Sequence, residues 1–574
     1  MKKLFILNTG RTLKQGISLE ADGKYSDKYN DEVATVRINP DDARELGIKD
    51  KCRITSKYSS IILKVVLDPN IPRGMIYIPM GPYANILVDP DTEGVGMPNL
   101  KHTYVHIEAT DKRETTLRDV LETYNIRRIE YYPLERPTKS GVKRIIENYI
   151  CPLCGELCDY LRVELDGDRI VNVIGACPKG KAKLLNYHRD RILKPMIKVN
   201  GRLKEVSLEE ALDKATEILV NSKHPLLFGW SSSSNEAMDV GMELAELLSG
   251  LIDNTTVICH GPTTLAVQET GSARATLGVI RNLADVIVLW GSNPVEAHPN
   301  HLPRWIFSKG TDISGRRERK VIVVDVRYTP TAKIADKFLK VLPGRDYELI
   351  TAMRMILKDL EVESEEVAGI PISEVYEVVD IMRSAKYGVI FVGMGVTMTG
   401  AKYRNLEELI KLVHDLNEWT RFALIPMRGH YNVSGVNEVM LWNSGYPYAI
   451  DFYRGYPKYI PGVTTATDAL INGDVDAALI IASDPVAHLP RKAVEHLSKI
   501  PVILIDPKWN LTALIADVII PSAMTGIEAD GTAYRLDNVP LRLKKIVDPP
   551  EGILSDKEIL EMILNRVKRI KLGG

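Results

Sequence analysis

Two stretches of the chain repeat the same order of apolar runs and polar loops, and this repeat constrains the fold more than any other feature. "ADVIVLWGSNPVEAHPNHLPR" resembles "VDAALIIASDPVAHLPR", and "KVIVVDVRYTPTAKIADKFLKVLP" resembles "IPVILIDPKWNLTALIADVIIP". Pro294 thus corresponds to Pro485, and Asp325 corresponds to Asp506. From about residue 206 onward, such runs alternate with amphipathic segments, which is typical of parallel strands covered by helices. The sequence therefore predicts two similar α/β halves.

Each half places polar residues where a strand is expected to end. A Gly-Ser-Asn-Pro or Ser-Asp-Pro loop follows the first strand, where backbone N–H groups could meet a phosphate. A later strand ends in Asp325 or Asp506, and a carboxylate there suits a ribose or a base edge. The two halves suggest two similar nucleotide-like ligands, or one ligand that is doubled. Duplication without two sites is the alternative.

Composition narrows the class of protein. Lys plus Arg is 74 and Asp plus Glu is 75, which gives no reason to expect a nucleic-acid or membrane partner. No apolar run approaches the length of a membrane span. The start, "MKKLFILNTGRTL", reaches Asn8 and Gly10 too soon for a signal-peptide core, and it predicts a first β-strand. We therefore expect a soluble, cytoplasmic protein.

The N-terminal part differs from the α/β halves. Residues 1 to about 110 alternate short β-rich runs with turn signals, which predicts a β-barrel. A single short helix, from Pro40 to Leu46, is expected there and should end at Gly47. Residues 111–148 are charged and contain Pro133 and Pro137, which predicts a helix followed by a linker.

Four of the six cysteines lie within one short segment, in the pattern C-x2-C-x3-C-x18-C: Cys151, Cys154, Cys158 and Cys177. Four thiolates can bind zinc or an iron–sulfur cluster. Structural zinc usually prefers two C-x2-C pairs, so three close thiolates and a distant fourth favour a [4Fe–4S] cluster. Lys179 follows the last cysteine and could neutralise an electron-rich cofactor, or it could be a solvated surface lysine.

The other two cysteines have different surroundings. Cys259 ends a predicted strand, "TTVIC", and precedes His260 and a Gly-Pro turn. A cysteine at a strand end usually packs in the core, but the adjacent histidine raises the alternatives of an active thiolate or a metal ligand. Cys52 lies within the barrel-like part and is expected to be a core residue.

The ordered set of motifs resembles the bis-molybdopterin-guanine-dinucleotide oxidoreductases. The cysteine segment with "CPKG" is similar to their cluster domain, and "GSNPVEAHP", "LPGRDYELI", "FVGMGVTMTG" and "ADVIIPSAMTGIEADGT" follow in the same order. Within that superfamily, "VICHGPTT" and "MRGHYNVSGVNEVM" resemble the formate-dehydrogenase branch. The leading barrel resembles the D-type subunit of the formylmethanofuran dehydrogenases, and residues 149–574 resemble their B-type subunit. The chain therefore resembles a D–B fusion.

The resemblance implies a multidomain α/β architecture. It comprises an N-terminal double-psi β-barrel, a small [4Fe–4S] domain and two related Rossmann-like α/β domains. The implied boundaries are 1–130 for the dinucleotide-binding barrel, 131–148 for a linker and 149–205 for the cluster domain. One α/β domain would combine 206–256 with 430–574, and the other, carrying the metal-ligand cysteine, would span 257–429.

The resemblance also implies the cofactors and the site. One [4Fe–4S] cluster would be bound by the four clustered cysteines, and two molybdopterin guanine dinucleotides would hold tungsten or molybdenum. Cys259 would bind that metal, Arg428 would hold a carboxylate, and His260 would give or take a proton. The implied contacts of the pterin cofactor are Thr9, Gly10, Arg11, Asn85, Lys179, Gly291, Ser292, Asn293, Asp325, Gly344, Asp346, Gly393, Met394, Gly395, Ser483, Asp484 and Asp506.

The implied reaction is the reversible two-electron reduction of CO2 to formate, as in methanogenesis. Formate would pass to an A-type, amidohydrolase-like subunit for condensation with methanofuran. Further partners would be ferredoxin or polyferredoxin subunits and a C-type subunit. The alternatives are a stand-alone, ferredoxin-linked formate dehydrogenase and an inactive scaffold subunit. Two departures limit the match: the second half has "ASDP" where the first has "GSNP", and His430, where many formate dehydrogenases carry Gln, is given no catalytic role.

Overall fold

The N-terminal strands close into a six-stranded barrel in the order β1-β5-β2-β4-β3-β6. The computed structural model describes residues 3–573. β1 pairs in parallel with β5, and β2 pairs in parallel with β4. Every second residue of β6 is buried, as expected of a barrel wall with one face in water. The strands are β1 (Lys3–Gly10), β2 (Thr35–Ile38), β3 (Lys51–Thr55), β4 (Ser60–Leu67), β5 (Met75–Pro79) and β6 (Thr103–Ala109).

The barrel carries more helices than the sequence predicted. The predicted helix is present as α3 (Pro40–Glu45), but α1 (Leu13–Asp22), α2 (Asp27–Val33) and α4 (Pro82–Asn85) accompany it, so the expectation of a single helix was wrong. Thr12 and Ser26 cap α1 and α2 with their side chains. These helices are short and weakly apolar, so packing stabilises them rather than their own sequence pattern.

The segment expected to be a helix and a linker contains a further strand. α5 (Leu117–Glu122) is the predicted helix, but β7 (Lys143–Tyr149) occupies the end of the predicted linker. It is the edge strand of a three-stranded sheet with β8 (Leu161–Asp166) and β9 (Arg169–Ile174). Most of β7 is exposed, so its sequence lacks the alternation that marks a half-buried strand. The cysteines lie around this sheet and at the start of α6 (Pro178–Leu185).

The first α/β half is built on a five-stranded parallel sheet in the order β16-β15-β14-β19-β20. Alternate residues of β14 enter the cores on opposite faces of the sheet, Val288 on one side and Leu289 on the other. Its strands are β14 (Val286–Trp290), β15 (Lys320–Asp325), β16 (Lys337–Lys340), β19 (Gly388–Val392) and β20 (Phe422–Pro426). Its helices are α9 (Gly261–Thr270), α10 (Leu277–Leu283), α11 (Pro294–Ala297), the π-helix η2 (Leu302–Ile306), η3 (Arg316–Glu318), η4 (Ala332–Ile334), α12 (Asp346–Leu357), α13 (Ile372–Arg383), α14 (Met394–Thr397) and α15 (Lys402–Leu416).

The second half is built on a nine-stranded sheet in the order β11-β10-β25-β24-β23-β12-β13-β21-β22, whose five central strands are parallel. Its strands are β10 (Met196–Val199), β11 (Arg202–Glu205), β12 (Pro225–Gly229), β13 (Leu251–Asn254), β21 (Ile450–Asp451), β22 (Lys458–Tyr459), β23 (Ala477–Ile481), β24 (Val502–Asp506) and β25 (Val518–Pro521). Its helices are α7 (Leu208–Asn221), α8 (Asn235–Leu248), η1 (Thr255–Ile258), α16 (Val433–Ser444), α17 (Ala466–Asn472), α18 (Pro485–His488), α19 (Arg491–Leu497), η5 (Leu511–Leu514) and α20 (Asp556–Leu572).

The repeated sequences occupy equivalent strands. β14, β15 and β16 of the first half lie in the same spatial order as β23, β24 and β25 of the second. The apolar runs "PLLFGW", "DVIVLWG", "KVIVVDV", "YGVIFVG", "AALIIAS" and "PVILIDP" all form parallel strands, β12, β14, β15, β19, β23 and β24. Two short hairpins complete the chain, β17 (Glu366–Val367) with β18 (Ile370–Pro371), and β26 (Gly531–Tyr534) with β27 (Pro540–Leu543).

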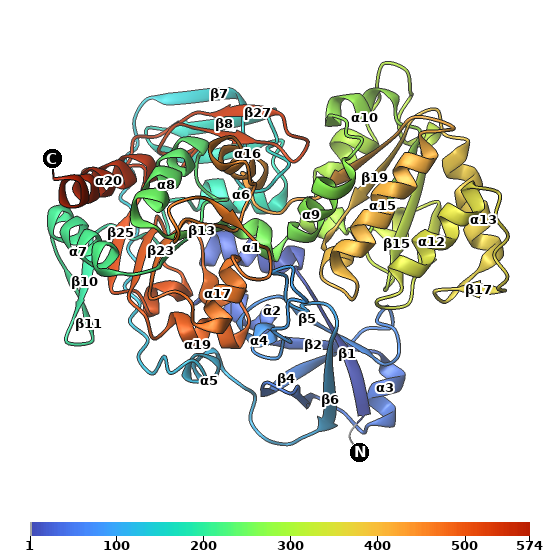
Figure 1. The fold of residues 1–574 in the computed structure, drawn as a ribbon, viewed down its shortest axis with the longest axis horizontal. Helices are drawn as coiled ribbons and strands as arrows, with labels where there is room; N and C mark the ends of the chain where they lie inside the picture. The colour runs from blue at the N-terminus through green and yellow to red at the C-terminus, as the bar shows by residue number, and fades with distance from the viewer. Residues whose placement is uncertain (1–2, 574) are drawn as a thin grey trace.

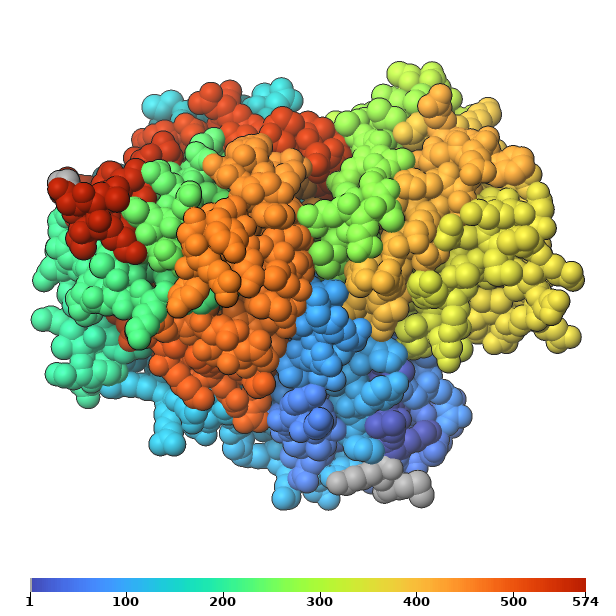
Figure 2. Space-filling model, in the orientation of Figure 1, coloured from blue at the N-terminus to red at the C-terminus, as the bar shows by residue number. Residues whose placement is uncertain are grey.

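The barrel lies beneath both α/β halves (Figure 1). In the space-filling view its blue atoms contact the orange part of the second half and the yellow-orange part of the first (Figure 2). The three-stranded sheet with β7 lies at the opposite, upper side of the second half (Figure 1). Within the described residues, no helix is both long and apolar enough to cross a membrane.

A buried carboxylate joins three separate parts of the chain. Glu528 accepts hydrogen bonds from Arg136 (2.7 Å) and, at both oxygens, from Arg191 (2.7 and 2.8 Å). The backbone N–H of Met524 also donates to it (2.9 Å). Glu528 and Arg191 are fully buried. The segment before β7 is thereby fixed to the C-terminal part of the second half.

We expect Glu528→Gln to lower the free energy of unfolding by roughly 3 kcal/mol, because the buried Arg191 loses its carboxylate and Arg136 keeps, among carboxylates, only the longer contact with Asp168 (3.3 Å). Urea unfolding followed by circular dichroism measures this. Glu217→Gln is the matched control, since the Lys214–Glu217 pair is exposed and such pairs contribute less than about 1 kcal/mol. Equal midpoints for the two variants would contradict the expected role of Glu528.

Candidate functional site

A cavity of about 440 Å³ opens where the barrel meets the carboxyl ends of both sheets. Strands of an open α/β sheet place ligands at this end, beside the point where the strand order reverses. The sequence-predicted residues on the cavity wall are Gly10, Arg11, Cys154, Lys179, Cys259, Gly291, Ser292, Asn293, Asp325, Asp346, Gly393, Met394, Gly395, Ser483, Asp484 and Asp506. Residues from the barrel, the cysteine segment and both α/β halves therefore share one cavity.

In the first half, two glycine loops touch at the reversal point between β14 and β19. The Gly393 N–H donates to Trp290 O (2.9 Å), and the Gly395 N–H donates to Gly291 O (2.9 Å). A Cβ at Gly395 would lie 2.6 Å from Gly291 Cα, and Gly291 has a φ of 55°. Only glycine permits this close approach, which leaves open space at the strand ends for a ligand.

The equivalent loops of the two halves share a hydrogen-bond pattern. Thr331 donates to Asn293 (2.6 Å), and Thr512 donates to Asp484 (2.7 Å). The Val295 and Val486 N–H groups then donate to these two threonines (3.3 Å each). The polar residue before each proline therefore anchors its own loop, a role that the sequence repeat did not reveal.

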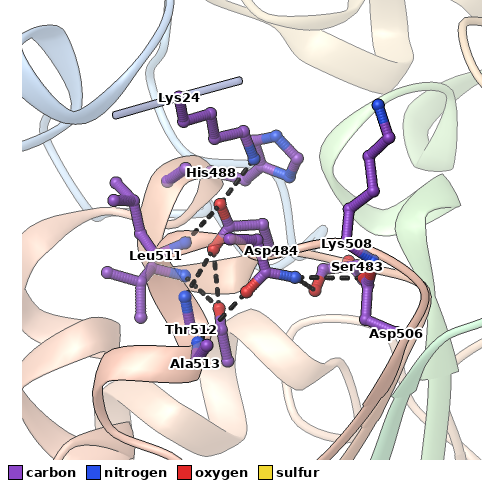
Figure 3. A network of polar contacts seen from close by, with 12 residues as sticks. Lys24, Ser483, Asp484, His488, Asp506, Lys508, Leu511, Thr512 and Ala513 are labelled. Atoms are coloured by element: carbon purple, nitrogen blue, oxygen red, sulfur yellow. Dashed lines mark hydrogen bonds and ion pairs between the residues drawn. The ribbon is translucent and has the colours of Figure 1, made fainter. Parts of the chain in front are cut away.

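Asp484 has additional partners that Asn293 lacks. Its carboxylate accepts from the N–H groups of Leu511 (3.1 Å) and Thr512 (2.9 Å), at the start of η5. Lys24, from the barrel, forms an ion pair with it (Figure 3). The hydrogen-bonding capacity of this carboxylate is thus largely used by protein donors, although it borders the cavity.

Three aspartates on the wall are held in a weakly acidic state by burial. Burial raises the pKa of Asp506 to about 7 and that of Asp346 to about 6, and it also raises the pKa of Asp325. Trp290 donates to one oxygen of Asp346 (2.8 Å), and the other oxygen has no partner within the described residues. These groups can accept or donate hydrogen bonds to a polar ligand.

Cations on the wall outnumber those the sequence analysis named. Arg11 and Lys179 were predicted, but Lys24, Lys101, Lys183, Arg327 and Lys508 also line the cavity. Burial, with neighbouring cations, lowers the pKa of Lys101 and of Lys508 to about 8. Arg327 and Lys508 occupy equivalent positions in the repeat, two residues after Asp325 and Asp506. That pairing was the signal available in the sequence.

Cys259 lies on the cavity wall, 6% exposed. It does not end a strand as predicted, because β13 stops at Asn254 and the 3-10 helix η1 carries the chain to Cys259. Burial raises the pKa of its thiol, whereas the Gly429 N–H, Arg428 and Arg11 lower it. Two cations and a backbone donor therefore favour a thiolate at this position once an electrophile binds it.

His260 and Arg428 are buried behind the wall and do not line the cavity. The ring nitrogens of His260 contact Thr263 Oγ1 (2.9 Å) and Met427 O (3.3 Å). Burial and Arg428 lower the pKa of His260 to about 3, so the ring is neutral. Arg428 Nε has no partner in the described structure. Their catalytic roles stay predictions, and proton transfer by His260 would require one of these bonds to open.

The four clustered cysteines lie together and are mostly buried. Burial, followed by the other three thiols, raises the pKa of Cys151 well above its usual value. A Cβ at Gly180 would lie 3.1 Å from Cys151 Sγ and 3.8 Å from Cys177 Sγ, so glycine makes room beside two thiols. Within residues 3–573, no group of three or more His, Cys, Asp or Glu side chains is close enough together to hold one metal ion.

Lys179 connects the cysteine segment to the cavity. It lies at the start of α6, and its amine donates to Ala297 O (2.5 Å). A Cβ at Gly16 would lie 2.4 Å from its side chain, so the barrel helix α1 leaves space for it. The alternative of a solvated surface lysine does not describe this position, because the side chain borders the cavity.

Three predicted cofactor residues lie off the wall: Thr9, Asn85 and Gly344. Thr9 donates to Leu100 O (2.6 Å), and Asn85 donates to Ala487 O (2.7 Å). Gly344 faces His102 and has a φ of 78°. These residues fix loops around the cavity, and any contact of theirs with a cofactor stays a prediction. Cys52 is fully buried in β3, as expected of a core residue.

The cavity suits a large, polar and anionic ligand. Among its buried polar atoms, Ser483 Oγ, Asn293 Nδ2 and Trp509 Nε1 have no partner within the described structure. Buried polar groups are normally satisfied, so these atoms are available to a ligand. The two lysines with lowered pKa suit phosphate, because a buried cation is costly without an anionic partner.

Comparison with known proteins agrees with this chemistry. Residues 191–566 match the model of the molybdopterin oxidoreductase family, and residues 5–104 match that of the molybdopterin dinucleotide binding domain. The chain belongs to the molybdopterin oxidoreductase family. It is an oxidoreductase with a domain for a molybdopterin dinucleotide, and the binding domain coincides with the N-terminal barrel.

Within the molybdopterin oxidoreductase family, the chain is similar to subunits of larger enzymes. The B-type subunit of tungsten-containing formylmethanofuran dehydrogenase 2 from Methanocaldococcus jannaschii is 47% identical over 74% of this chain and 99% of that protein. The alpha subunit of F420-dependent formate dehydrogenase 1 from Methanococcus maripaludis is 27% identical over 73% of this chain and 70% of that protein.

A solved structure shares the fold. The formyltransferase/hydrolase complex from Methylorubrum extorquens, in complex with methylofuran, has a chain that superposes with a TM-score of 0.53. The match covers 66% of this chain and 99% of that chain at 21% identity. At this identity the likeness concerns the fold alone.

We expect the cofactor-free cavity to bind GDP less tightly as the pH rises from about 7 to about 9. The pKa of Lys101 and of Lys508 is about 8, so both amines are cationic below that pH and neutral above it. Loss of one charged contact corresponds to roughly tenfold weaker binding. Calorimetric titration measures this.

Lys508→Met should weaken binding at about pH 7 and flatten the pH dependence. Lys181→Met is the control, because Lys181 is exposed on the same helix as Lys179 and does not line the cavity. Unchanged affinity in Lys508→Met would exclude that lysine from the anion site.

Proposed function

We propose that this chain is the catalytic component of a formylmethanofuran dehydrogenase in which a D-like barrel is fused to a B-like body. The 47% identity to a B-type subunit over nearly its whole length supports the B-like part. The dinucleotide-binding match at residues 5–104 supports the D-like part. The barrel would be a double-psi barrel, and the two α/β halves would be related Rossmann-like domains.

One observation carries the proposal. Cys259 and Cys154 border the same cavity, with Lys179 between the cysteine segment and the strand-end loops. Cys259 would bind the catalytic metal, and Cys154 would belong to the cluster that relays electrons. Both at one cavity would let electrons pass between the cluster and the bound cofactor. The similarity to the alpha subunit of a formate dehydrogenase supports a formate-dehydrogenase-like reaction.

The residues present fit a bis-molybdopterin-guanine-dinucleotide centre. The glycine loops after β14 and β19 and the Ser483 loop would hold the two nucleotide arms, with Asp325 and Asp506 toward ribose or guanine. Arg11, Lys101 and Lys508 would neutralise the phosphates. When bound, the centre supplies two-electron redox chemistry at tungsten or molybdenum, for which Cys259 offers a soft thiolate ligand.

The four clustered cysteines would bind one [4Fe–4S] cluster. Three closely spaced thiolates with a distant fourth are typical of iron–sulfur ligation. The thiols are mutually close and buried, which raises the pKa of Cys151, so they would lose their protons only as a cationic metal cluster binds. Cys154 is the ligand on the cavity side, so the cluster would deliver electrons one at a time at that wall.

The substrate would be CO2 or formate, which differ by two electrons and one proton. Arg428 is cationic, lies behind the wall next to Cys259 and has an Nε without a partner in the described structure, so its charge would stabilise a carboxylate bound at Cys259, and direct contact would require the wall to rearrange. His260 would contribute as a proton donor or acceptor, or by holding the Met427 carbonyl next to Arg428.

Formate would then pass to an A-type, amidohydrolase-like subunit for condensation with methanofuran, as a step of methanogenesis in the cytoplasm. Ferredoxin or polyferredoxin subunits and a C-type subunit would complete the complex. The similarity to a named B-type subunit supports a complex of several different chains. The 27% identity to a formate dehydrogenase keeps a stand-alone, ferredoxin-linked formate dehydrogenase as the second candidate. Methanofuran-dependent turnover of the purified complex distinguishes the two.

We expect Cys259→Ala to abolish formate oxidation while both pterins and four irons per chain remain bound, because no other thiol outside the cysteine segment borders the cavity within the described residues. Dye-linked formate oxidation and metal analysis measure this. Cys52→Ala is the matched control, since Cys52 is equally buried but lies in the barrel. Wild-type turnover in Cys259→Ala would exclude this thiol as the metal ligand.

We expect Arg428→Lys to oxidise formate at least ~10-fold more slowly with a normal cofactor content. An oriented charge at a developing transition state typically contributes ~3 kcal/mol, and lysine retains the charge without the planar fork. Steady-state kinetics with formate as the variable substrate tests this. Near-normal turnover with the metal in place would remove Arg428 from the mechanism and weaken the formate-dehydrogenase-like assignment.

A further inference from the structure

One segment of the first α/β half packs against the loop that carries Cys154 and Cys158. It runs from Asn300 into the π-helix η2, a type of turn that often occurs at functional sites. His301 Nδ1 contacts one oxygen of Glu156 (2.7 Å), and the Trp305 N–H donates to the other (2.9 Å). Glu156 lies between Cys154 and Cys158 and is 1% exposed. The two contacts fix the segment against the loop.

Asn300, at the start of this segment, reaches one cysteine directly. Its two amide N–H groups are shared among three acceptors, Gly175 O (2.9 Å), Tyr160 Oη (2.9 Å) and Cys158 Sγ (3.7 Å). Contacts at 3.7 Å are within reach of hydrogen bonds to sulfur. The carbonyl and the hydroxyl hold the amide in place, so its approach to the sulfur is a fixed feature.

Tyr160 supplies a second donor to the same sulfur. Its hydroxyl accepts a hydrogen bond from Asn300 (2.9 Å) and acts on Cys158, whose thiol pKa it lowers. A tyrosine hydroxyl carries a proton at neutral pH, so it can donate toward the sulfur. The Arg304 guanidinium lies 4.3 Å from the centre of the Tyr160 ring and polarises it.

We propose that Tyr160 and Asn300 set the reduction potential of the four-cysteine centre by donating hydrogen bonds to Cys158. The proposal rests on the [4Fe–4S] cluster of the proposed function. Reduction adds one electron, and hence one negative charge, to the cluster and its thiolates. Donors to a ligating sulfur stabilise that more anionic state and raise the potential. Both residues act through Cys158, so they are positioning residues.

The arrangement also joins two parts of the molecule. Asn300 belongs to the half that presents the Gly291 loop to the cavity, whereas Cys158 and Tyr160 belong to the cysteine segment. A displacement of one against the other would change the donors to the sulfur.

The test uses the full chain with its cluster, as Tyr160→Phe, Asn300→Ala and the double variant. Redox titration followed by the EPR signal of the reduced cluster gives the midpoint potential. We expect both single variants to shift to more negative potential, by up to a tenfold change in the oxidised-to-reduced ratio at a fixed poise, or ~59 mV for one electron. The double variant should shift further.

Tyr456→Phe is the matched control, because Tyr456 is 55% exposed and lies in the loop between β21 and β22. Iron content and unfolding midpoints identify variants that fail to assemble, and the conservative Tyr160→Phe preserves the packing of the ring. Unchanged potentials in variants with four irons would overturn the proposal while leaving the proposed function intact. Absence of a four-iron signal in the wild-type protein would instead overturn the cluster itself.

Discussion

The contact between the N-terminal barrel and the second α/β half, made by the ion pair of Lys24 and Asp484, is the constraint on which the shared cavity depends. Lys24 comes from the barrel, and Asp484 lies at the end of β23, where it also holds the first turn of η5 (Figure 3). Both side chains are buried, so loss of either partner would leave the other charge in the interior without its counter-ion. The barrel is therefore fixed over the strand ends, and a cavity forms between them.

That constraint explains the distribution of charge around the cavity. Asp484 neutralises Lys24, whereas Lys101 is buried, Lys508 is half-buried, and both have lowered pKa values. Buried cations of this kind are costly in an empty protein and favourable beside phosphate. Two nucleotide arms with phosphates would neutralise these lysines. Binding of such a ligand would therefore stabilise the folded chain.

Much of the α/β architecture could be predicted because its signals are local. Buried parallel strands are continuous apolar runs, and glycine loops follow some of them directly, as in the runs that became β14 and β19. The short helices α1 and α2 and the edge strand β7 were missed, because packing against other elements stabilises them and their own patterns are weak. Cys259 was placed on a strand, but it follows a single 3-10 turn.

The sequence by itself determined the repeat of the two α/β halves, the ordered set of motifs and the residues able to bind metal or phosphate. Each of these features depends only on residue type and short spacing. Only the tertiary structure decided which of these residues share a cavity. His260 and Arg428 lie behind the wall, Asp484 is occupied by Lys24, and Lys508 faces the ligand space. Such choices depend on contacts between residues hundreds of positions apart, and packing rather than local pattern selects them.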